Sequence, residues 1–288
     1  MSAYKRNYKN SDYQLVCDFL IEINKNDKTH INWNWARLEW MIEHPEFNKE
    51  EANKIGLWFD NDKLVATAIY DMYFGEASCL TLPGYEYLFD ELLDYAYNNL
   101  KDENGLGICI NKNNTKEIEK CMLSRFVLSE QKEFVATIVL DKEFDSSLKN
   151  NLRFKDFDPS KNVDEVAWVI YQGFDHGNNR EEFEKQNKPV NPRVHFNPYL
   201  SSLVETKEGE GVAYCSLWYD SRTDYAYLEP LCVIPEYRKM GVGKALVYEL
   251  LNRAKKLGAK EVVVISDNPF YQKIGFRITQ EYEFYWKK

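Results

Sequence analysis

The stretch PEYRKMGVGKAL, residues 235–246, joins an apolar run to a long helical pattern. Gly241 and Gly243 lie where the helix should begin. Glycine is a poor helix residue, so its presence there indicates a special backbone conformation or a close approach to another group. Arg238, Lys239 and Lys244 add positive charge nearby. Because the first N–H groups of a helix are unpaired and lie at its positive end, this turn predicts a site for a phosphate or pyrophosphate.

Two common phosphate-binding motifs do not fit this turn. The spacing of a P-loop is different, and the dinucleotide motif needs a third glycine that Gly241-Val-Gly243 lacks. A glycine pair alone is also compatible with an ordinary strand-to-helix turn whose lysines are exposed to water. The surrounding sequence must therefore distinguish an anion site from such a turn.

The surrounding sequence predicts an alternation of strands and helices. Two strand-like runs, 211–220 and 225–234, precede the turn, and Pro230 inside the second predicts a bulge or an unpaired edge. A helical stripe follows over 242–257 and ends at Gly258. The β-branched run AKEVVVISD then predicts a strand, NPFYQKIGF a short helix, and the remaining residues one or two closing strands.

The first half of the chain repeats this order at an offset of about 150 residues. Pro-x-Tyr occurs at 83–85 and again at 235–237, and RFVLSEQKEF resembles GFRITQEYEF. The polar stretch 141–150 is the natural linker. We therefore expect two similar domains, residues 1–145 and 150–288.

The two repeats differ at the turn itself. When they are aligned at their prolines, Phe89 and Glu91 replace the two glycines, and Glu86 replaces Arg238. Negative charge at a helix start stabilises the helix dipole but repels a phosphate. The first repeat should therefore have kept the strand order and lost the anion site.

Composition narrows the class of protein. The 288 residues carry a net charge of −9, with a pI near 5.2, which argues against nucleic acid as a partner. The apolar runs are too short to cross a membrane, and the first residues lack the apolar core of a secretion signal, so we expect a cytoplasmic protein. The six cysteines and four histidines lack metal-ligand spacing, which favours buried free thiols over disulfides or zinc, and we assign no metal.

At this point the chain resembles the GNAT acyltransferase superfamily. Its acyl-CoA signature, Q/R-x-x-G-x-G/A, is matched by Arg238-Lys-Met-Gly241-Val-Gly243, and the preceding strand and FYQKIGF also match. The layout is similar to a bacterial branch of tandem-domain members such as mycothiol synthase. The resemblance covers 150–288 well and 1–145 in outline.

The resemblance implies an α/β (α+β) fold of two tandem GNAT-like domains, each a mixed, mostly antiparallel sheet flanked by helices. Two strands of the second domain should splay apart and hold the pantetheine arm of acetyl-CoA, whereas the first domain should be degenerate. The implied acyl-CoA-binding residues are Leu231, Cys232, Val233, Arg238, Lys239, Met240, Gly241, Val242, Gly243, Lys244 and Asn268.

Acyl transfer to an amine needs a base, a donor to the oxyanion and an acid for the leaving thiolate. Tyr271 matches the acid of the family, and its alternative is packing beside neighbouring phenylalanines. Glu229, a carboxylate inside an apolar strand, is the candidate base through a water, and its alternative is an ion pair with Arg222 or Arg193. The backbone N–H of Val233 is the expected oxyanion donor.

We therefore predict an acetyl-CoA-dependent N-acetyltransferase acting on the amine of a small molecule or amino compound. The polar segment 172–200 should shape the acceptor site. Its acidic residues could attract an amine, although a solvated helix face is the alternative. Two other functions stay open: a non-catalytic acyl-CoA sensor, and a peptide or protein N-acetyltransferase. The oligomeric state is not predicted.

Overall fold

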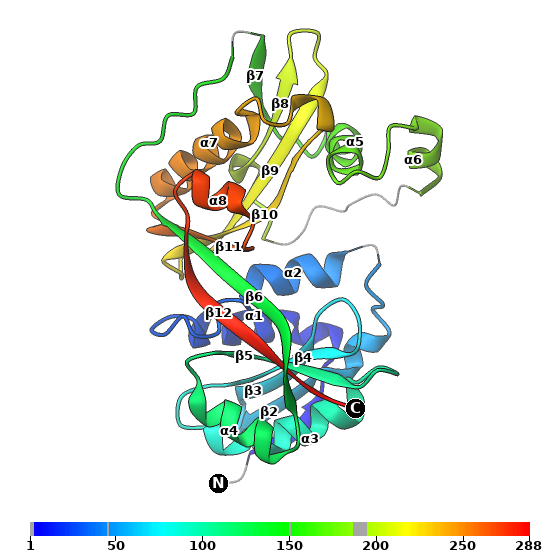
Figure 1. Cartoon of the computed structure of the whole chain (residues 1–288), viewed down its shortest axis with the longest axis vertical. Helices are drawn as coiled ribbons and strands as arrows, with labels where there is room; N and C mark the ends of the chain where they lie inside the picture. Colours follow the sequence, from blue (N-terminus) through cyan, green and yellow to red (C-terminus); the bar gives the residue numbers. More distant parts are fainter. Residues whose placement is uncertain (1–2, 45, 150, 187–194) are drawn as a thin grey trace. The chain divides into compact units, whose positions relative to one another are not determined.

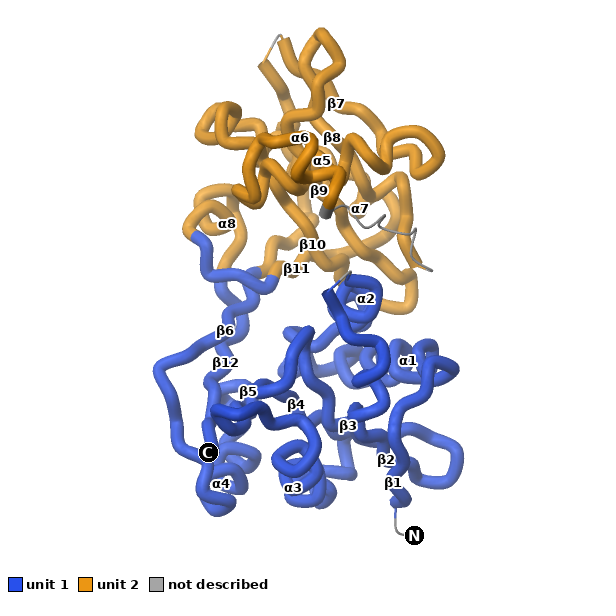
Figure 2. The backbone as a smooth tube through the Cα atoms, turned by 90° about the vertical axis from the view of Figure 1, so that its right-hand side faces the viewer, with its two compact units in different colours: residues 1–136, 265–268, 278–288 blue, residues 137–264, 269–277 orange. Residues whose placement is uncertain are grey.

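The computed structural model describes residues 3–44, 46–149, 151–186 and 195–288. It divides into two compact units, shown in Figure 2. Unit 1 comprises residues 1–136, 265–268 and 278–288, and unit 2 comprises 137–264 and 269–277. Both units are thus discontinuous in sequence, and the C-terminal segment of the chain belongs to unit 1.

Unit 1 is a mixed sheet with helices on its two faces (Figure 1). Its strands run in the order β1-β2-β3-β4-β5-β12-β6, and β4 and β5 pair in parallel. The strands are β1 (Tyr4–Asn7), β2 (Gly56–Asp60), β3 (Lys63–Tyr70), β4 (Glu76–Thr81), β5 (Leu106–Asn111), β6 (Val127–Val139) and β12 (Arg277–Lys287). The helices are α1 (Tyr13–Ile23), α2 (Trp35–Glu43), α3 (Phe89–Asn99) and α4 (Thr115–Leu123), with 3-10 turns at Asn10–Asp12, Glu51–Lys54 and Glu86–Leu88.

Unit 2 repeats this plan in the order β11-β10-β9-β8-β7, with β10 and β11 parallel. Its strands are β7 (Leu152–Asp156), β8 (Ser201–Thr206), β9 (Gly211–Tyr219), β10 (Tyr225–Val233) and β11 (Glu261–Ile265). Its helices are α5 (Val163–Gly173), α6 (Arg180–Gln186), α7 (Val242–Leu257) and α8 (Pro269–Lys273), with 3-10 turns at Pro198–Leu200 and Pro235–Tyr237. The predicted α/β (α+β) class, with mixed, mostly antiparallel strands flanked by helices in each unit, is confirmed.

The internal repeat is visible in equivalent turns after α4 and α8. The N–H of Phe126 donates to the Cys121 carbonyl at 3.0 Å, and the N–H of Phe276 donates to the Tyr271 carbonyl at 3.0 Å. The residue before each phenylalanine is left-handed, with φ +68° at Arg125 and +103° at Gly275. Cys121 and Tyr271 therefore occupy the same place in the two repeats, which agrees with the likeness of RFVLSEQKEF to GFRITQEYEF at an offset of about 150 residues.

The C-terminal residues form one closing strand, β12, and it pairs with β5 of unit 1. Trp286 lies opposite Gly107, where a Cβ would come within 2.6 Å of the Trp286 ring, so glycine leaves the space that the indole fills. In return, the chain just after β6 joins unit 2, where the N–H of Leu140 donates to the Lys260 carbonyl at 2.8 Å. The last residues of each repeat therefore belong to the unit formed mainly by the other repeat.

The cysteines agree with the sequence prediction of free thiols. All six lie among the described residues and none forms a disulfide, and five of them are buried: Cys17, Cys79, Cys121, Cys215 and Cys232. Among the described residues, no helix is both long enough and apolar enough to span a bilayer.

Candidate active site

The predicted irregularity at Pro230 is a bulge in β10. Leu228 pairs with Leu217 of β9, and the next pair joins Leu231 to Cys215, so β10 carries one extra residue in this interval. The Trp218 indole donates to the Glu229 carbonyl at 2.6 Å, and this bond fixes the bulged backbone.

From the bulge onward, β10 and β11 no longer pair. Their parallel register ends at Tyr227 and Val263, although β10 continues to Val233. The N–H of Ile234 donates to Val212 of β9 at 3.0 Å. Because neighbouring residues of an antiparallel strand direct their N–H groups to opposite edges, the N–H of Val233 faces the edge towards β11. The backbone of β10 is thus presented at the open side of the splayed pair.

The turn before α7 has the special backbone that its glycines predict. Lys239 and Gly241 are both left-handed, with φ +61° and +87°. Gly241 is the N-cap of α7, and a Cβ built on it would meet nothing within 4 Å. The first turn of α7 carries no acidic residue. No carboxylate of the first turn therefore caps the first N–H groups of α7, and the space beside Gly241 is open.

Gly243 has a different role from Gly241. A Cβ on Gly243 would lie 3.3 Å from Val233 Cγ2 and 3.4 Å from Phe270 Cζ. The missing side chain thus lets the start of α7 pack closely against the end of β10 and against α8. The sequence analysis explained both glycines by the close approach of an anion. In the structure, packing within unit 2 is enough to explain why residue 243 has no side chain.

The Arg238 side chain stabilises the turn through bonds to β10 and to the end of α5. Its Nε donates to the Val233 carbonyl at 3.0 Å, its Nη2 donates to the Gly173 carbonyl at 2.8 Å, and it forms an ion pair with Asp175 at 3.0 Å. The guanidinium therefore ties the end of α5 to the end of β10, and Asp175 offsets its charge.

The other positions of the motif differ in exposure. Lys239, Met240 and Lys244 are exposed, and Val242 is buried. The Lys244 ammonium lies 5.2 Å from the centre of the Tyr248 ring, along the helix. Any anion at this turn would thus meet backbone N–H groups first and exposed lysines around them.

Tyr271 is held by aromatic packing at the start of α8. Its ring centre lies 5.2 Å from that of Phe270 and 5.5 Å from that of Phe276, so the packing contacts of the alternative reading are present. Burial, together with the nearby Glu229 carboxylate, raises the pKa of Tyr271 well above its usual range. The phenol therefore keeps its proton at neutral pH, as an acid must.

Glu229 is half-buried on the bulge of β10. Its charge acts on both Tyr271 and Cys215, so the three side chains share one electrostatic environment. Of the two arginines considered as partners, Arg222 pairs with Asp220 at 2.7 Å, and Arg193 lies outside the described residues.

The remaining predicted positions are placed as follows. Cys232 is buried, and its thiol donates to the Val169 carbonyl at 3.7 Å. Leu231 is half-buried on β10. Asn268 belongs to unit 1, and its backbone N–H donates to Ser266 Oγ at 3.1 Å.

Sequence reasoning missed the part of the site that α5 supplies. Gly173 ends this helix, and a Cβ there would approach the Cys232 Cβ to 2.6 Å. The signal was a glycine at the end of an apolar helical pattern, which indicates close packing. Asp175, considered only as an acidic residue of the acceptor segment, is the partner of Arg238.

The equivalent turn of unit 1 is closed by its own side chains. The Glu86 carboxylate accepts from the N–H of Gly84 at 3.0 Å, and Asp90 and Glu91 lie in the first turn of α3. Glu91 also accepts from the Trp58 indole at 2.8 Å, and Phe89 is buried. Negative charge and a phenylalanine thus occupy the place where unit 2 has an open glycine turn.

Comparison with known proteins agrees with this geometry. Residues 162–276 match the model of the Acetyltransferase (GNAT) family. The chain is 39% identical over 54 residues to glucosamine 6-phosphate N-acetyltransferase of Trypanosoma brucei brucei, a match that covers 18% of this chain and 37% of that enzyme. It is also 29% identical over 110 residues to the uncharacterized N-acetyltransferase YjcF of Bacillus subtilis, covering 36% of this chain and 78% of that protein.

Solved structures show the same fold over the whole chain. A tandem GNAT protein from the clavulanic acid biosynthesis pathway has a TM-score of 0.60 at 11% identity, over 99% of this chain and 98% of that one. A GCN5-related N-acetyltransferase from Sphaerobacter thermophilus has a TM-score of 0.57 at 14% identity, over 99% and 95% of the two chains. Residues 162–276 are thus similar to the GNAT family, and the whole chain shares its fold with these solved structures.

Proposed function

We propose that the protein is an acetyl-CoA-dependent N-acetyltransferase whose acceptor is the amine of a small molecule. The observation that carries this proposal is the combination of two features in unit 2: the open, left-handed turn at Gly241 and the edge of β10 after Tyr227, which β11 no longer pairs. One suits a pyrophosphate and the other a pantetheine amide.

The residues fit acetyl-CoA, which would supply an activated acetyl thioester. The N–H groups at the start of α7 would hold the pyrophosphate, because Gly241 leaves its Cβ position open. The backbone of Leu231 to Val233 would pair with the pantetheine arm. Lys239 and Lys244 would add positive charge at the rim.

The chemistry needs three groups from this chain. Glu229 would take the proton of the acceptor amine through a water molecule. The N–H of Val233 would donate to the carbonyl oxygen as negative charge develops on it. Tyr271, whose pKa is raised, would donate its phenolic proton to the departing thiolate.

A small amine is the proposed acceptor because a relative with local similarity is named for glucosamine 6-phosphate, an amino sugar. The match covers 37% of that enzyme.

In this proposal residues 150–288 are the catalytic domain, and residues 1–145 carry no acyl-CoA site. The support is the occupied turn of unit 1, where Glu86, Phe89 and Glu91 replace the residues of the open turn. Calorimetric titration of the whole chain should then give one CoA per chain. Two sites per chain would contradict the assignment.

The test of the activity is thiol release from acetyl-CoA in the presence of a panel of amines, with product mass as confirmation. Turnover that requires both acetyl-CoA and a small amine supports the proposal. CoA binding without turnover on any amine would indicate a sensor, and acetylation of peptides alone would indicate a peptide N-acetyltransferase; either result would overturn it.

A further inference from the structure

The family resemblance assigns Arg238 to acyl-CoA binding, but its side chain is engaged within unit 2. Its Nε donates to the Val233 carbonyl at 3.0 Å and its Nη2 to the Gly173 carbonyl at 2.8 Å. Its Nη1 donates to the Asp175 carboxylate at 3.1 Å. These bonds use three of the five N–H groups that a guanidinium carries, and Asp175 offsets its charge. In this arrangement Arg238 has little left to offer a phosphate.

The bond to Val233 fixes a peptide group beside the expected oxyanion donor. The carbonyl of Val233 and the N–H of Ile234 belong to one planar peptide group. Arg238 holds its oxygen, and the Ile234 N–H donates to the Val212 carbonyl at 3.0 Å. Because both sides of this peptide group are bonded, it cannot rotate freely. The adjoining Val233 N–H therefore keeps one direction.

The bond to Gly173 holds the end of α5 against the same part of β10. A Cβ on Gly173 would lie 2.6 Å from the Cys232 Cβ and 3.4 Å from the backbone nitrogen of Val233. The end of α5 is thus packed directly beside the expected oxyanion donor. Because the guanidinium bonds to Gly173 and Val233 at once, it sets the distance between the two segments.

The backbone on both sides of this link is left-handed at residues other than glycine. Asp175, just beyond the end of α5, has φ +62°, and Lys239, next to Arg238, has φ +61°. Such backbone conformations are unfavourable for residues with side chains, and they cluster at functional sites. The Asp175 carboxylate pairs with Arg238 at 3.0 Å. The protein therefore keeps a strained backbone at both ends of the Arg238 link.

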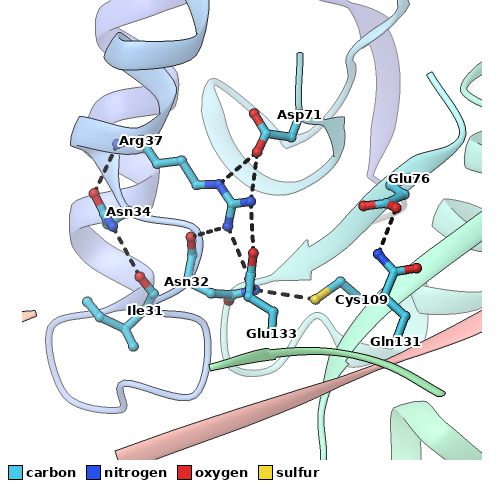
Figure 3. Close-up of polar contacts among 9 residues, drawn as sticks. All are labelled: Ile31, Asn32, Asn34, Arg37, Asp71, Glu76, Cys109, Gln131 and Glu133. Atoms are coloured by element: carbon cyan, nitrogen blue, oxygen red, sulfur yellow. Dashed lines mark hydrogen bonds and ion pairs between the residues drawn. The ribbon is translucent and has the colours of Figure 1, made fainter. Parts of the chain in front are cut away.

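Arg37 of unit 1 provides a contrast and a control (Figure 3). Its guanidinium donates to the two oxygens of Glu133 at 3.1 and 3.0 Å and to Asp71 at 2.7 Å. Its side chain is 15% exposed, compared with 39% for that of Arg238. None of these partners belongs to the candidate site of unit 2. Arg37 thus mainly joins side chains within unit 1, whereas Arg238 holds two backbone carbonyls at that site.

We propose that Arg238 is a positioning residue for acyl transfer: it holds the Val233 peptide and the end of α5 so that the Val233 N–H is aimed at the acetyl carbonyl oxygen. This role presupposes the acetyltransferase function proposed above. The pyrophosphate is then left to the N–H groups of α7 and to the exposed lysines. The N–H of Ala245 donates to the Gly241 carbonyl at 3.0 Å, and this bond at the turn does not involve the guanidinium.

The test replaces both members of the ion pair, Arg238→Gln together with Asp175→Asn, which keeps the net charge beside the turn unchanged. With the most active amine of the panel, kcat should fall by about ten- to a hundredfold, because a misdirected oxyanion donor costs rate of this order. Calorimetric affinity for CoA should stay close to that of the wild type. Asp175→Asn alone keeps both carbonyl bonds of Arg238 and should lose far less rate.

Arg37→Gln is the matched control for a general loss of stability. It leaves Glu133 and Asp71 without their guanidinium partner, so it should lower the urea midpoint. The kcat of the folded Arg37→Gln protein should equal that of the wild type. A fall in kcat that is confined to the Arg238 variant is therefore not a consequence of lower stability.

NMR provides a readout that does not depend on turnover. The Arg238 Nε–H, bonded to the Val233 carbonyl, should exchange with water more slowly than that of an unbonded arginine, and its signal should persist when CoA is added. Loss of this signal on addition of CoA would show that the guanidinium moves to the phosphates, which would overturn the proposal. An equal kcat in the folded double variant, or a loss of CoA affinity at constant kcat, would overturn it too. A wild type without turnover on any amine would instead overturn the acetyltransferase proposal together with this one.

Discussion

Gly241 can be tested with two substitutions of nearly equal size, Gly241→Asp and Gly241→Asn. Both place a side chain in space that is open in the protein, and both must adopt φ +87°. That conformation costs an ordinary residue about 1–2 kcal/mol, and aspartate and asparagine tolerate it best. Neither side chain gains a normal capping bond, because an N-cap residue that bonds to the helix has an extended backbone, whereas Gly241 is left-handed. The two variants should therefore have similar stability.

The charge is what separates them. Two unit charges about 4 Å apart repel by about 1 kcal/mol in water and by about 4 kcal/mol at the dielectric typical of a protein surface. Since Gly241 is exposed, the true value lies in this range. Calorimetry should then show CoA binding to Gly241→Asp weaker than to Gly241→Asn by about fivefold to a thousandfold.

Salt provides a second measurement of the same effect. At 1 M salt the Debye length falls to about 3 Å, so the gap between the two variants should narrow. Equal affinities of the folded Asp and Asn variants at low salt would refute the placement of a pyrophosphate at this turn.

Four further predictions concern chemistry and packing. Gly243→Ala should not gain the roughly 1 kcal/mol of unfolding free energy that alanine usually adds over glycine in a helix, because its Cβ would lie 3.3 Å from Val233 Cγ2; a full gain in the urea midpoint would contradict that packing. Tyr271→Phe should lower kcat by roughly ten- to a thousandfold at constant acetyl-CoA affinity; equal turnover would show that another group protonates the thiolate. Glu229→Gln should lower kcat and remove the acidic limb of the pH–rate profile, so persistence of that limb would point to a different base. Burial raises the pKa of Glu117 from 4.5 to about 8 in the folded protein. In the unfolded chain this carboxyl ionises at a lower pH, so the free energy of unfolding falls as pH rises from 4.5 to 8. Compared with wild type, Glu117→Gln should gain up to about 5 kcal/mol between pH 4.5 and 8, and a gain independent of pH would refute the buried carboxyl.

The sequence by itself determined those features that depend on local backbone preferences. A glycine at the start of a helix predicted a special turn, and the left-handed Gly241 confirms it. A proline inside an apolar strand predicted the bulge of β10. The offset of about 150 residues predicted the duplication, and the matching turns at Cys121 and Tyr271 agree with it.

Only the tertiary structure decided which strand pairs with which and which side chains meet. Alternation in residues 277–287 predicts a strand, but nothing in it specifies β5 as the partner, which lies some 170 residues earlier in the chain. The bonds of Arg238 to Gly173 and Asp175, and of Arg37 to Glu133, join residues from distant segments. Dihedral preference and periodicity are properties of neighbouring residues, whereas these contacts exist only after the chain has brought separate elements together.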